Sequence, residues 1–342
     1  MLSSPSTPVS EHTRTRQRQP APASSKRLGL LRRIFRSEAL RGYLFISPWL
    51  LGFLALGLWP LLDTVYNSFT KYNLFNTPVW IGLQNYEAIF LHDPVFAQIS
   101  LNMAWYVPCS TLISIGGGLA LAVLLNRQFV GNHLFRVIIY VPSLLVGVAV
   151  GMMFQQAFSA GDAGVINEFL GLFHLGPFNW LSNFKFLGMG IIALILVNCW
   201  FVGGTMLIFL AGLKGISKTY YEAASIDGAS KWTQFTHITL PLLSPVILFN
   251  TIMVVIGHIQ VFEVPLTFAA GGSGGLTDVN PLGYHNSLGS FLTYLYVQAF
   301  VYNDFGYGSA LAVIIFVITL LLTLLILWMF RKFLYYEGES RS

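Results

Sequence analysis

The chain has 342 residues, of which 55% are hydrophobic and only 10% are charged, and its mean hydropathy is +0.65. A soluble domain carries about 25% charged residues, so this composition argues against an ordinary soluble protein and favours a membrane protein. The formal net charge of +5 does not indicate a nucleic-acid partner, because the basic residues do not gather with aromatic residues on one expected surface.

Residues 1–42 differ from everything that follows. They are rich in Pro, Ser and Thr, and they hold nine of the 19 Lys and Arg residues. A segment of this composition buries too little apolar surface to fold alone, which predicts a flexible basic arm. Residues 43–333 are expected to form one transmembrane domain, and residues 334–342 a short tail.

Six apolar segments are each close to the roughly 20 residues that a bilayer-spanning helix needs. In chain order they are residues 43–62, 105–125, 137–154, 188–213, 241–262 and 309–330. Lipid cannot satisfy backbone polar groups, so all six are expected to be helical and the fold to be an all-α polytopic membrane protein. The apolar stretch 288–301 is too short to span and is expected to form an interfacial or re-entrant helix.

The positions of the basic residues predict the orientation of the chain. With both termini in the cytoplasm, only Lys71 and Lys185 of the 19 Lys and Arg residues fall outside, and residues 265–308 contain none. Cytoplasmic loops carry such an excess of Lys and Arg, so both termini are expected to be cytoplasmic. The same basic residues would face anionic membrane lipid.

The segment between the fourth and fifth expected spans has a helix–turn–helix pattern. Thr219 and Glu222 have the spacing of a capping box, which would start a helix. Asp227 and Gly228 form a turn or helix-end signal. Pro241 would then lie in the first turn of the next span, where its missing N–H is tolerated. In a plain cytosolic loop Glu222 would only be a capping partner, but the whole pattern is more specific than that.

The pattern Glu-Ala-Ala-x2-Asp-Gly-Ala-x5-Phe-x2-Ile-x-Leu-Pro-x3-Pro, from Glu222 to Pro245, resembles the coupling loop of ABC importer permeases. In that family the loop, here about residues 217–240, is a short helical element that docks into a cleft of the cytosolic ATPase. The resemblance implies that the glutamate meets a basic residue of the ATPase. The positions implied for docking are Glu222, Ala223, Ala224, Asp227, Gly228 and Ala229.

The resemblance extends over about residues 43–333 and is to the carbohydrate-type permeases of maltose, oligosaccharide and glycerol-3-phosphate importers. Motifs such as Asp93-Pro94 and residues 306–312 contribute to it. The implied fold is that of a type I ABC importer permease, with six transmembrane helices and cytosolic coupling helices. One departure is the Ala-Gly-Gly-Ser-Gly-Gly run at 270–275, where such sequences usually carry Thr-Gly-Gly-Gly-Pro.

The resemblance also implies a substrate path. In maltose-type relatives the sugar sits between the spans that flank the coupling loop. The matching positions here are Asn198 and Phe201 before the loop, and His258 and Phe262 after it. Each polar residue could instead make a contact between helices. His258 and Gln260 are expected to point to different faces of a helix, at about 100° per residue.

The implied function is import of a sugar or oligosaccharide by alternating access in the inner membrane of a bacterium. The chain contains no Gly-x4-Gly-Lys-[Ser/Thr] motif, so it is expected to be no enzyme and to hold no cofactor. ATP and Mg²⁺ would be bound by an ABC ATPase dimer. Further expected partners are a second permease subunit, giving a heterodimer, and an extracytoplasmic solute-binding protein.

Three alternatives are weighed against this interpretation. An ion-driven secondary transporter usually shows internal repeats and would need carboxylates within its spans, and neither is evident in the sequence. A membrane-embedded enzyme would need a catalytic constellation, and none is apparent. An ABC permease for a non-sugar solute such as glycerol-3-phosphate remains an alternative within the same family.

Overall fold

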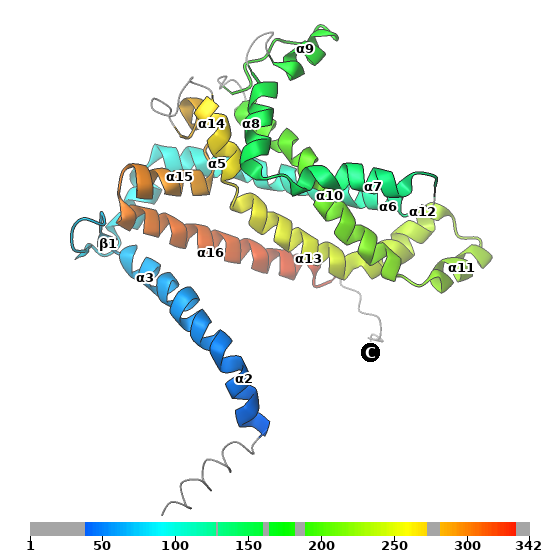
Figure 1. The fold of residues 1–342 in the computed structure, drawn as a ribbon, viewed down its shortest axis with the longest axis horizontal. Helices are drawn as coiled ribbons and strands as arrows, with labels where there is room; N and C mark the ends of the chain where they lie inside the picture. The colour runs from blue at the N-terminus through cyan, green and yellow to red at the C-terminus, as the bar shows by residue number, and fades with distance from the viewer. Residues whose placement is uncertain (1–37, 128, 160–163, 182–188, 272–280, 333–342) are drawn as a thin grey trace, which may run out of the picture. The chain divides into compact units, whose positions relative to one another are not determined.

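The computed structural model describes residues 38–127, 129–159, 164–181, 189–271 and 281–332 (Figure 1). Most of the expected basic arm, the expected tail and most of the glycine run at 270–275 lie outside the described residues. The chain separates into two compact units, Met1–Leu61 and Leu62–Ser342.

The first unit is helical wherever it is described. It contains α2 (Glu38–Gly52), the π-helical segment η1 (Phe53–Leu58) and the first residues of α3 (Trp59–Asn67). The residues from Gly42 to Asn67, which include all of α3, form one apolar helix of 26 residues. At about 1.5 Å per residue this helix is longer than the roughly 30 Å hydrocarbon core of a bilayer, which confirms the first expected span.

The second unit consists mainly of helices. After α3 its elements are β1 (Thr70–Lys71), β2 (Val79–Trp80), α4 (Gln84–Glu87), η2 (Ala88–His92), α5 (Pro94–Leu112), η3 (Ile113–Gly117), α6 (Gly118–Leu125), α7 (Asn132–Tyr140), η4 (Val141–Leu144), α8 (Gly147–Ala157), α9 (Val165–Gly171), α10 (Met189–Gly215), α11 (Lys218–Ile226), α12 (Lys231–Gln234), η6 (Phe235–Thr239), α13 (Leu240–Ile259), α14 (Glu263–Gly271), η7 (Tyr284–Asn286), α15 (Phe291–Tyr296), η8 (Val297–Val301) and α16 (Phe305–Phe330). The two short strands pair antiparallel, with Thr70 opposite Trp80.

Within the described residues, five helices are long and apolar enough to cross a membrane, and the number is six if one helix pair bent by 97° is counted as a span. This agrees with the six expected spans. The short apolar stretch predicted near 288–301 is also helical, as Phe291–Val301, and is too short to count as a span.

The second span begins earlier than the sequence suggested, at Pro94 rather than near residue 105. Polar side chains in its first turns conceal it in the sequence. Gln98 Nε2 and Asn102 Nδ2 donate to the backbone carbonyls of His285 and Asn286, at 2.6 and 3.0 Å. Because these amides bind protein and not lipid, the helix tolerates them.

Asp93 holds the start of this span against the last third of the chain. Its Oδ1 accepts hydrogen bonds from the first turn of α5, and its Oδ2 accepts hydrogen bonds from the hydroxyls of Tyr294 and Tyr307. Burial, and then the hydrogen bond to Asp93, raises the pKa of Tyr294 above its ordinary value. Tyr294 therefore stays protonated and keeps donating to the carboxylate.

The third expected span is not a single helix, which corrects the prediction of one continuous helix over 137–154. It is broken into Asn132–Leu144 and Gly147–Ala157, which meet at 97°. Pro142 supplies no N–H at this point, and the Ser143 hydroxyl donates to the Tyr140 carbonyl at 2.6 Å. Val146 is then extended (φ −63°, ψ 135°), so the chain leaves the first helix axis before α8 begins.

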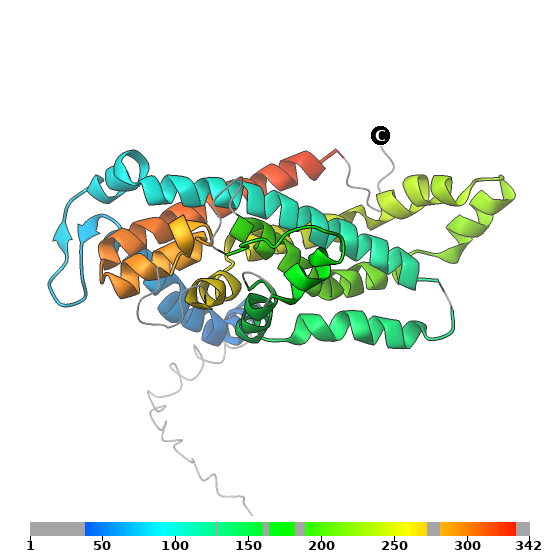
Figure 2. The same ribbon diagram turned by 90° about the horizontal axis from the view of Figure 1, so that it is seen from above.

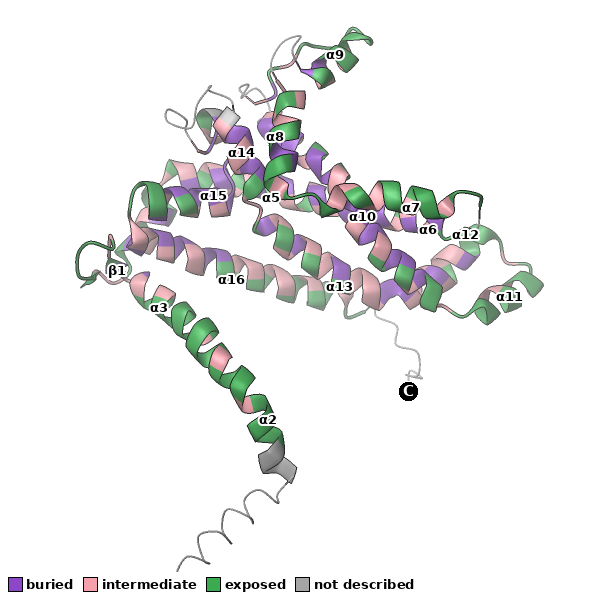
Figure 3. Cartoon of the chain, viewed as in Figure 1, coloured by how far each residue is buried: buried purple, intermediate pink, exposed green. Residues whose placement is uncertain are grey.

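Helix α10 lies at the centre of the second unit. It packs against α5, α6, α7 and α13. It contributes buried residues to both apolar clusters, for example Val197 to one and Phe209 to the other. Figure 3 shows buried residues along α10, whereas α11 is mainly exposed. The helices that flank α10 are therefore positioned by it.

Gly203 lets α10 approach the broken third span. A Cβ on Gly203 would lie 2.1 Å from the carbonyl oxygen of Ile139, a backbone atom that cannot rotate away. At the neighbouring Gly204 the nearest atom to a Cβ would be the Ser143 Oγ, at 3.9 Å. The two glycines thus differ in packing while they share a helix.

Gly203→Ala is expected to lower the stability of the chain by about 1–3 kcal/mol, since overpacking forces backbone shifts. Gly204→Ala is the matched control, and it is expected to be neutral or slightly stabilising because Ala favours helix by about 1 kcal/mol over Gly. Thermal unfolding of the purified chain in detergent measures both. Equal unfolding temperatures for the two variants would contradict the observed helix contact.

Candidate functional site

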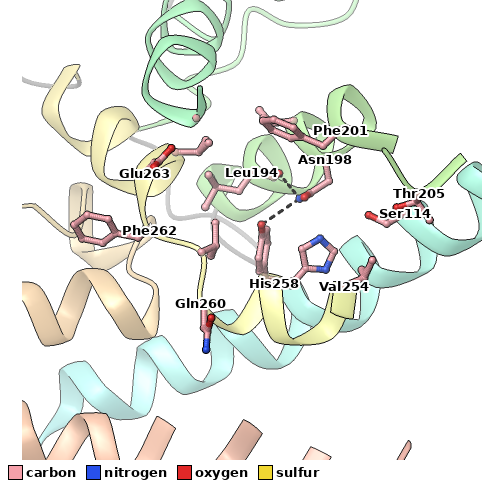
Figure 4. A pocket seen from close by; sticks show the side chains of 16 residues that line it. Ser114, Leu194, Asn198, Phe201, Thr205, Val254, His258, Gln260, Phe262 and Glu263 are labelled. Carbon is pink, nitrogen blue, oxygen red and sulfur yellow. Dashed lines mark hydrogen bonds between the residues drawn. The ribbon is translucent and has the colours of Figure 1, made fainter. Parts of the chain in front are cut away.

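A cavity of about 530 Å³ lies between α5, α10, α13 and α14 (Figure 4). The four residues predicted to form a substrate path, Asn198, Phe201, His258 and Phe262, all line it. They come from α10 on one side and from the end of α13 and the turn after it on the other. The structure thus brings together residues that are more than fifty positions apart in the sequence.

Asn198 makes contacts with a neighbouring helix and also lines the cavity. It is 8% exposed. Its Nδ2 donates to Tyr106 Oη at 3.2 Å, Ser110 Oγ at 3.0 Å and the Leu194 carbonyl at 2.9 Å. The amide therefore ties α10 to α5. Its Oδ1 accepts no hydrogen bond from the described residues, and so it remains an acceptor for a ligand hydroxyl.

A histidine and aromatic side chains also line the cavity. The His258 Nδ1 lies 3.2 Å from Thr111 Oγ1, and its ring packs edge-on against Tyr106 at 5.7 Å between centroids. Phe262 makes a similar edge contact with Tyr296 at 5.5 Å. A few polar groups among aromatic walls suit a ligand with an apolar face and hydroxyl edges.

Gln260 is also among the residues that line the cavity, directly after α13 ends at Ile259. In Figure 4 its side chain points away from that of His258, as expected from their spacing in the sequence. Both residues therefore border the cavity, but their side chains do not share one face.

Glu263 was not among the predicted path residues, although it lines the cavity and is solvent-exposed. It begins α14, which packs closely on α8: a Cβ on Gly147 would lie 2.1 Å from Glu263 Oε2, and one on Gly151 would lie 1.8 Å from Thr267 Oγ1. In the sequence Glu263 directly follows the expected span 241–262. Hydropathy alone does not show that a residue at the end of a span faces a cavity.

The predicted docking loop forms a helical hairpin at the ends of α10 and α13, seen in both Figure 1 and Figure 2. Its first helix starts differently from the prediction. Ser217 and not Thr219 is the N-cap, because the Ser217 hydroxyl accepts from Thr219 N at 3.4 Å. Glu222 lies farther along the helix, and Ser217 is the residue that caps it.

The predicted stop signal at Asp227-Gly228 is confirmed. Gly228 has φ +77°, a left-handed conformation that favours glycine. The N–H of Gly228 donates to the Ser225 carbonyl, and that of Ala229 to the Ala224 carbonyl at 2.8 Å. This pair of bonds is a Schellman motif, which ends α11 and turns the chain back.

Contacts between its two arms hold the hairpin in shape. Tyr221 Oη and Thr239 Oγ1 lie 2.9 Å apart, and the buried Gln234 donates from Nε2 to Ser225 Oγ at 2.9 Å. The opposite face of α11 is open: Glu222 and Ala223 are exposed, and Ile226 at the tip is 87% exposed. This face of α11 therefore presents an exposed apolar side chain close to an exposed carboxylate.

The profile of the family described as binding-protein-dependent transport system inner membrane component matches residues 114–334. The chain belongs to this family. It is 38% identical over 310 residues to the probable ABC transporter permease protein YesP of Bacillus subtilis, covering 90% of this chain and 96% of that protein. It is 31% identical to the arabinooligosaccharides transport system permease protein AraP of the same species, covering 94% and 97%.

The fold is also that of a solved transporter. A chain in the crystal structure of a bacterial ABC transporter involved in import of the acidic polysaccharide alginate superposes with a TM-score of 0.71 at 22% identity, over 89% of this chain and 99% of that one. This confirms the predicted fold of an ABC importer permease.

The cavity and the hairpin are connected through two helices of this chain. Helices α10 and α13 both line the cavity, and the hairpin connects them. Pro241 lies in the first turn of α13, as predicted, and a π-helical segment joins this helix to α12 so that the apolar helix runs from Lys231. The distance along the helix axis is roughly 26 Å in both helices, at 1.5 Å per residue, measured from Asn198 to the end of α10 and from His258 back to Leu240.

Asn198→Leu is expected to destabilise the purified chain by about 1–3 kcal/mol, because it leaves the buried hydroxyls of Tyr106 and Ser110 without their donor. Adding Tyr106→Phe and Ser110→Ala to this variant should recover most of the loss, since then no polar group is orphaned. Unfolding temperatures in detergent measure both. If the triple variant is less stable than the single one, the hydrogen-bond network is not what stabilises this contact.

Proposed function

We propose that this chain is a transmembrane subunit of an ABC importer for a neutral oligosaccharide. The observation that carries the proposal is the single cavity lined by Asn198, Phe201, His258 and Phe262, which lies on the same two helices as the exposed hairpin. Relatives named as arabinooligosaccharide permeases support the sugar class. The cavity supports it by offering aromatic faces with amide and imidazole groups, which match the two sides of a sugar ring.

The charge of the cavity favours a neutral sugar over an acidic one. Of the residues that line it, Glu263 is the only carboxylate, and there is no Lys or Arg among them. A uronate substrate would meet a like charge and find no cation to pair with in this wall. This distinguishes the proposed substrate from the acidic polysaccharide of the solved alginate transporter.

The proposed energy source is an ABC ATPase dimer, which would hold ATP and Mg²⁺ and dock on the hairpin through Glu222, Ala223 and the turn at Gly228. A second permease subunit would supply the other hairpin, and a solute-binding protein would deliver the sugar from outside. Docking to a cytoplasmic ATPase requires that the hairpin and both termini are cytoplasmic. This orientation agrees with the excess of Lys and Arg on that side of the expected spans. Movement of the hairpin would tilt α10 and α13 together and so change access to the cavity.

The first test is the charge reversal Glu222→Lys, with the chain co-expressed with its partner subunits. We expect the amount of ATPase that co-purifies and the ATP-driven uptake to fall by at least about tenfold, because breaking a charge pair across an interface costs about 2–5 kcal/mol. Glu168→Lys on α9, another exposed helical glutamate, is the matched control and should change neither. Uptake that persists without ATP and collapses with the ion gradient would disprove the proposal.

The second test concerns the substrate. Cells that express the whole transporter should import a neutral pentose or hexose oligosaccharide in preference to a uronate oligosaccharide of equal length. Glu263→Gln should raise the acidic-to-neutral uptake ratio by about fivefold, equivalent to ~1 kcal/mol. Glu87→Gln, an exposed carboxylate on α4 outside the cavity, should leave the ratio unchanged. An acidic substrate preferred by the unaltered protein would refute the assignment to neutral sugars.

A further inference from the structure

A second hollow, here called the α6 groove, lies away from the candidate site. It has a volume of about 570 Å³ and runs between the end of the second span and the start of α12. Its floor is apolar, with Gly116, Leu119, Ala120 and Val123 from η3 and α6. Its volume lies in the range of about 300–1,000 Å³ that small-molecule sites occupy.

Two cations stand at one end of the groove. Arg127 is the second residue after the span Pro94–Leu125, and Lys231 begins the apolar helix Lys231–Ala270. Both side chains are exposed. Lys231 Nζ donates to Gln234 Oε1 at 3.1 Å, and neither cation has an ion pair with any described carboxylate. Two positive charges thus lie at one end of the apolar groove, with no ion pair to a described carboxylate.

Two aromatic side chains, Trp232 and Phe235, also line the cationic end of the groove. Trp232 is 72% exposed, and its ring lies 5.8 Å from that of Phe235. Tryptophan prefers the headgroup level of a bilayer, where one edge of the ring is apolar and the other is wet. Its position beside Arg127 and Lys231 places the cationic end of the groove at that level and the apolar floor deeper in the membrane.

We propose that the α6 groove binds an anionic phospholipid, with the phosphate between Arg127 and Lys231 and an acyl chain along the floor. The guanidinium and the ammonium can both donate to phosphate oxygens. From Gly116 to Leu124 the floor extends about 12 Å at 1.5 Å per residue, which suits several methylene groups of an acyl chain. Basic pockets between transmembrane helices are a general form of anionic lipid site.

Charge and depth favour lipid over a protein occupant. A cytosolic protein could pair with the two cations but could not reach the floor, because Gly116–Leu124 belong to the apolar span. A transmembrane helix of another subunit could cover the floor, but it would need a carboxylate at the right end to pair with the two cations. An anionic amphiphile satisfies both ends of the groove by its own chemistry.

Binding is tested on the full-length chain in detergent by native mass spectrometry, with titration of phosphatidylglycerol or phosphatidylcholine. We expect tighter binding of phosphatidylglycerol, and for Arg127→Gln/Lys231→Gln a loss of about 25-fold, roughly fivefold for each cation. The control with the same net charge is Arg331→Gln/Lys332→Gln after α16, which should bind like the unaltered chain. Equal behaviour of the two double variants overturns the proposal.

The floor is tested separately with a phosphatidylglycerol that carries a photoreactive group on its acyl chain. Cross-links are expected within residues 116–124. Gly116→Leu should abolish them without unfolding the chain, since a Cβ at Gly116 meets no atom within 4 Å and so projects into open space. Gly171→Leu on α9, where a Cβ also meets no atom within 4 Å, is the matched control.

Two further outcomes overturn the proposal: cross-links outside the groove, and displacement of the lipid when the partner subunits assemble, which would make the groove a subunit interface. Neither experiment measures transport or ATP hydrolysis. A failure of the lipid site is therefore distinguishable from a failure of the proposed import function.

Discussion

The packing of α10 against α5, α6, α7 and α13 is the contact on which the second unit depends. Helices in lipid gain little from the hydrophobic effect on association, so small residues and a few buried hydrogen bonds must hold them together. Gly203 provides the close approach to the broken third span, and Asn198 provides the hydrogen bonds to α5. The same helix carries the wall of the cavity, so the features that stabilise the bundle also shape the site.

Polar groups within the apolar helices serve two roles at once. Asn198 bonds Tyr106 and Ser110 with its nitrogen while it faces the cavity. His258 touches Thr111 and lines the same space. A helix contact and a binding surface are therefore not exclusive interpretations of one residue, because an amide or an imidazole has more than one hydrogen-bonding atom.

The hairpin between α10 and α13 connects the proposed docking surface to the two helices that line the cavity. Its two arms are joined by Tyr221–Thr239 and Gln234–Ser225 contacts, so it can move as one body. The helix that follows it is continuous from Lys231 onward. A push on the hairpin would reach the cavity through intact helical hydrogen bonds, with no loop between to absorb it. The proposed lipid groove is lined by Lys231, which is the first residue of this same helix.

The sequence by itself determined the membrane class, the number of spans, the family and the end of α11 at Gly228. These follow from local properties: apolar segment length, residue order and the left-handed conformation that glycine permits. Only the tertiary structure decided the 97° break near Pro142, the early start of the second span and the shared cavity of His258, Gln260 and Glu263. Each depends on partners far away in the chain, such as the 285–286 carbonyls that accept from Gln98 and Asn102. Hydropathy and helical periodicity carry no information on such partners, and so the sequence alone could not place them.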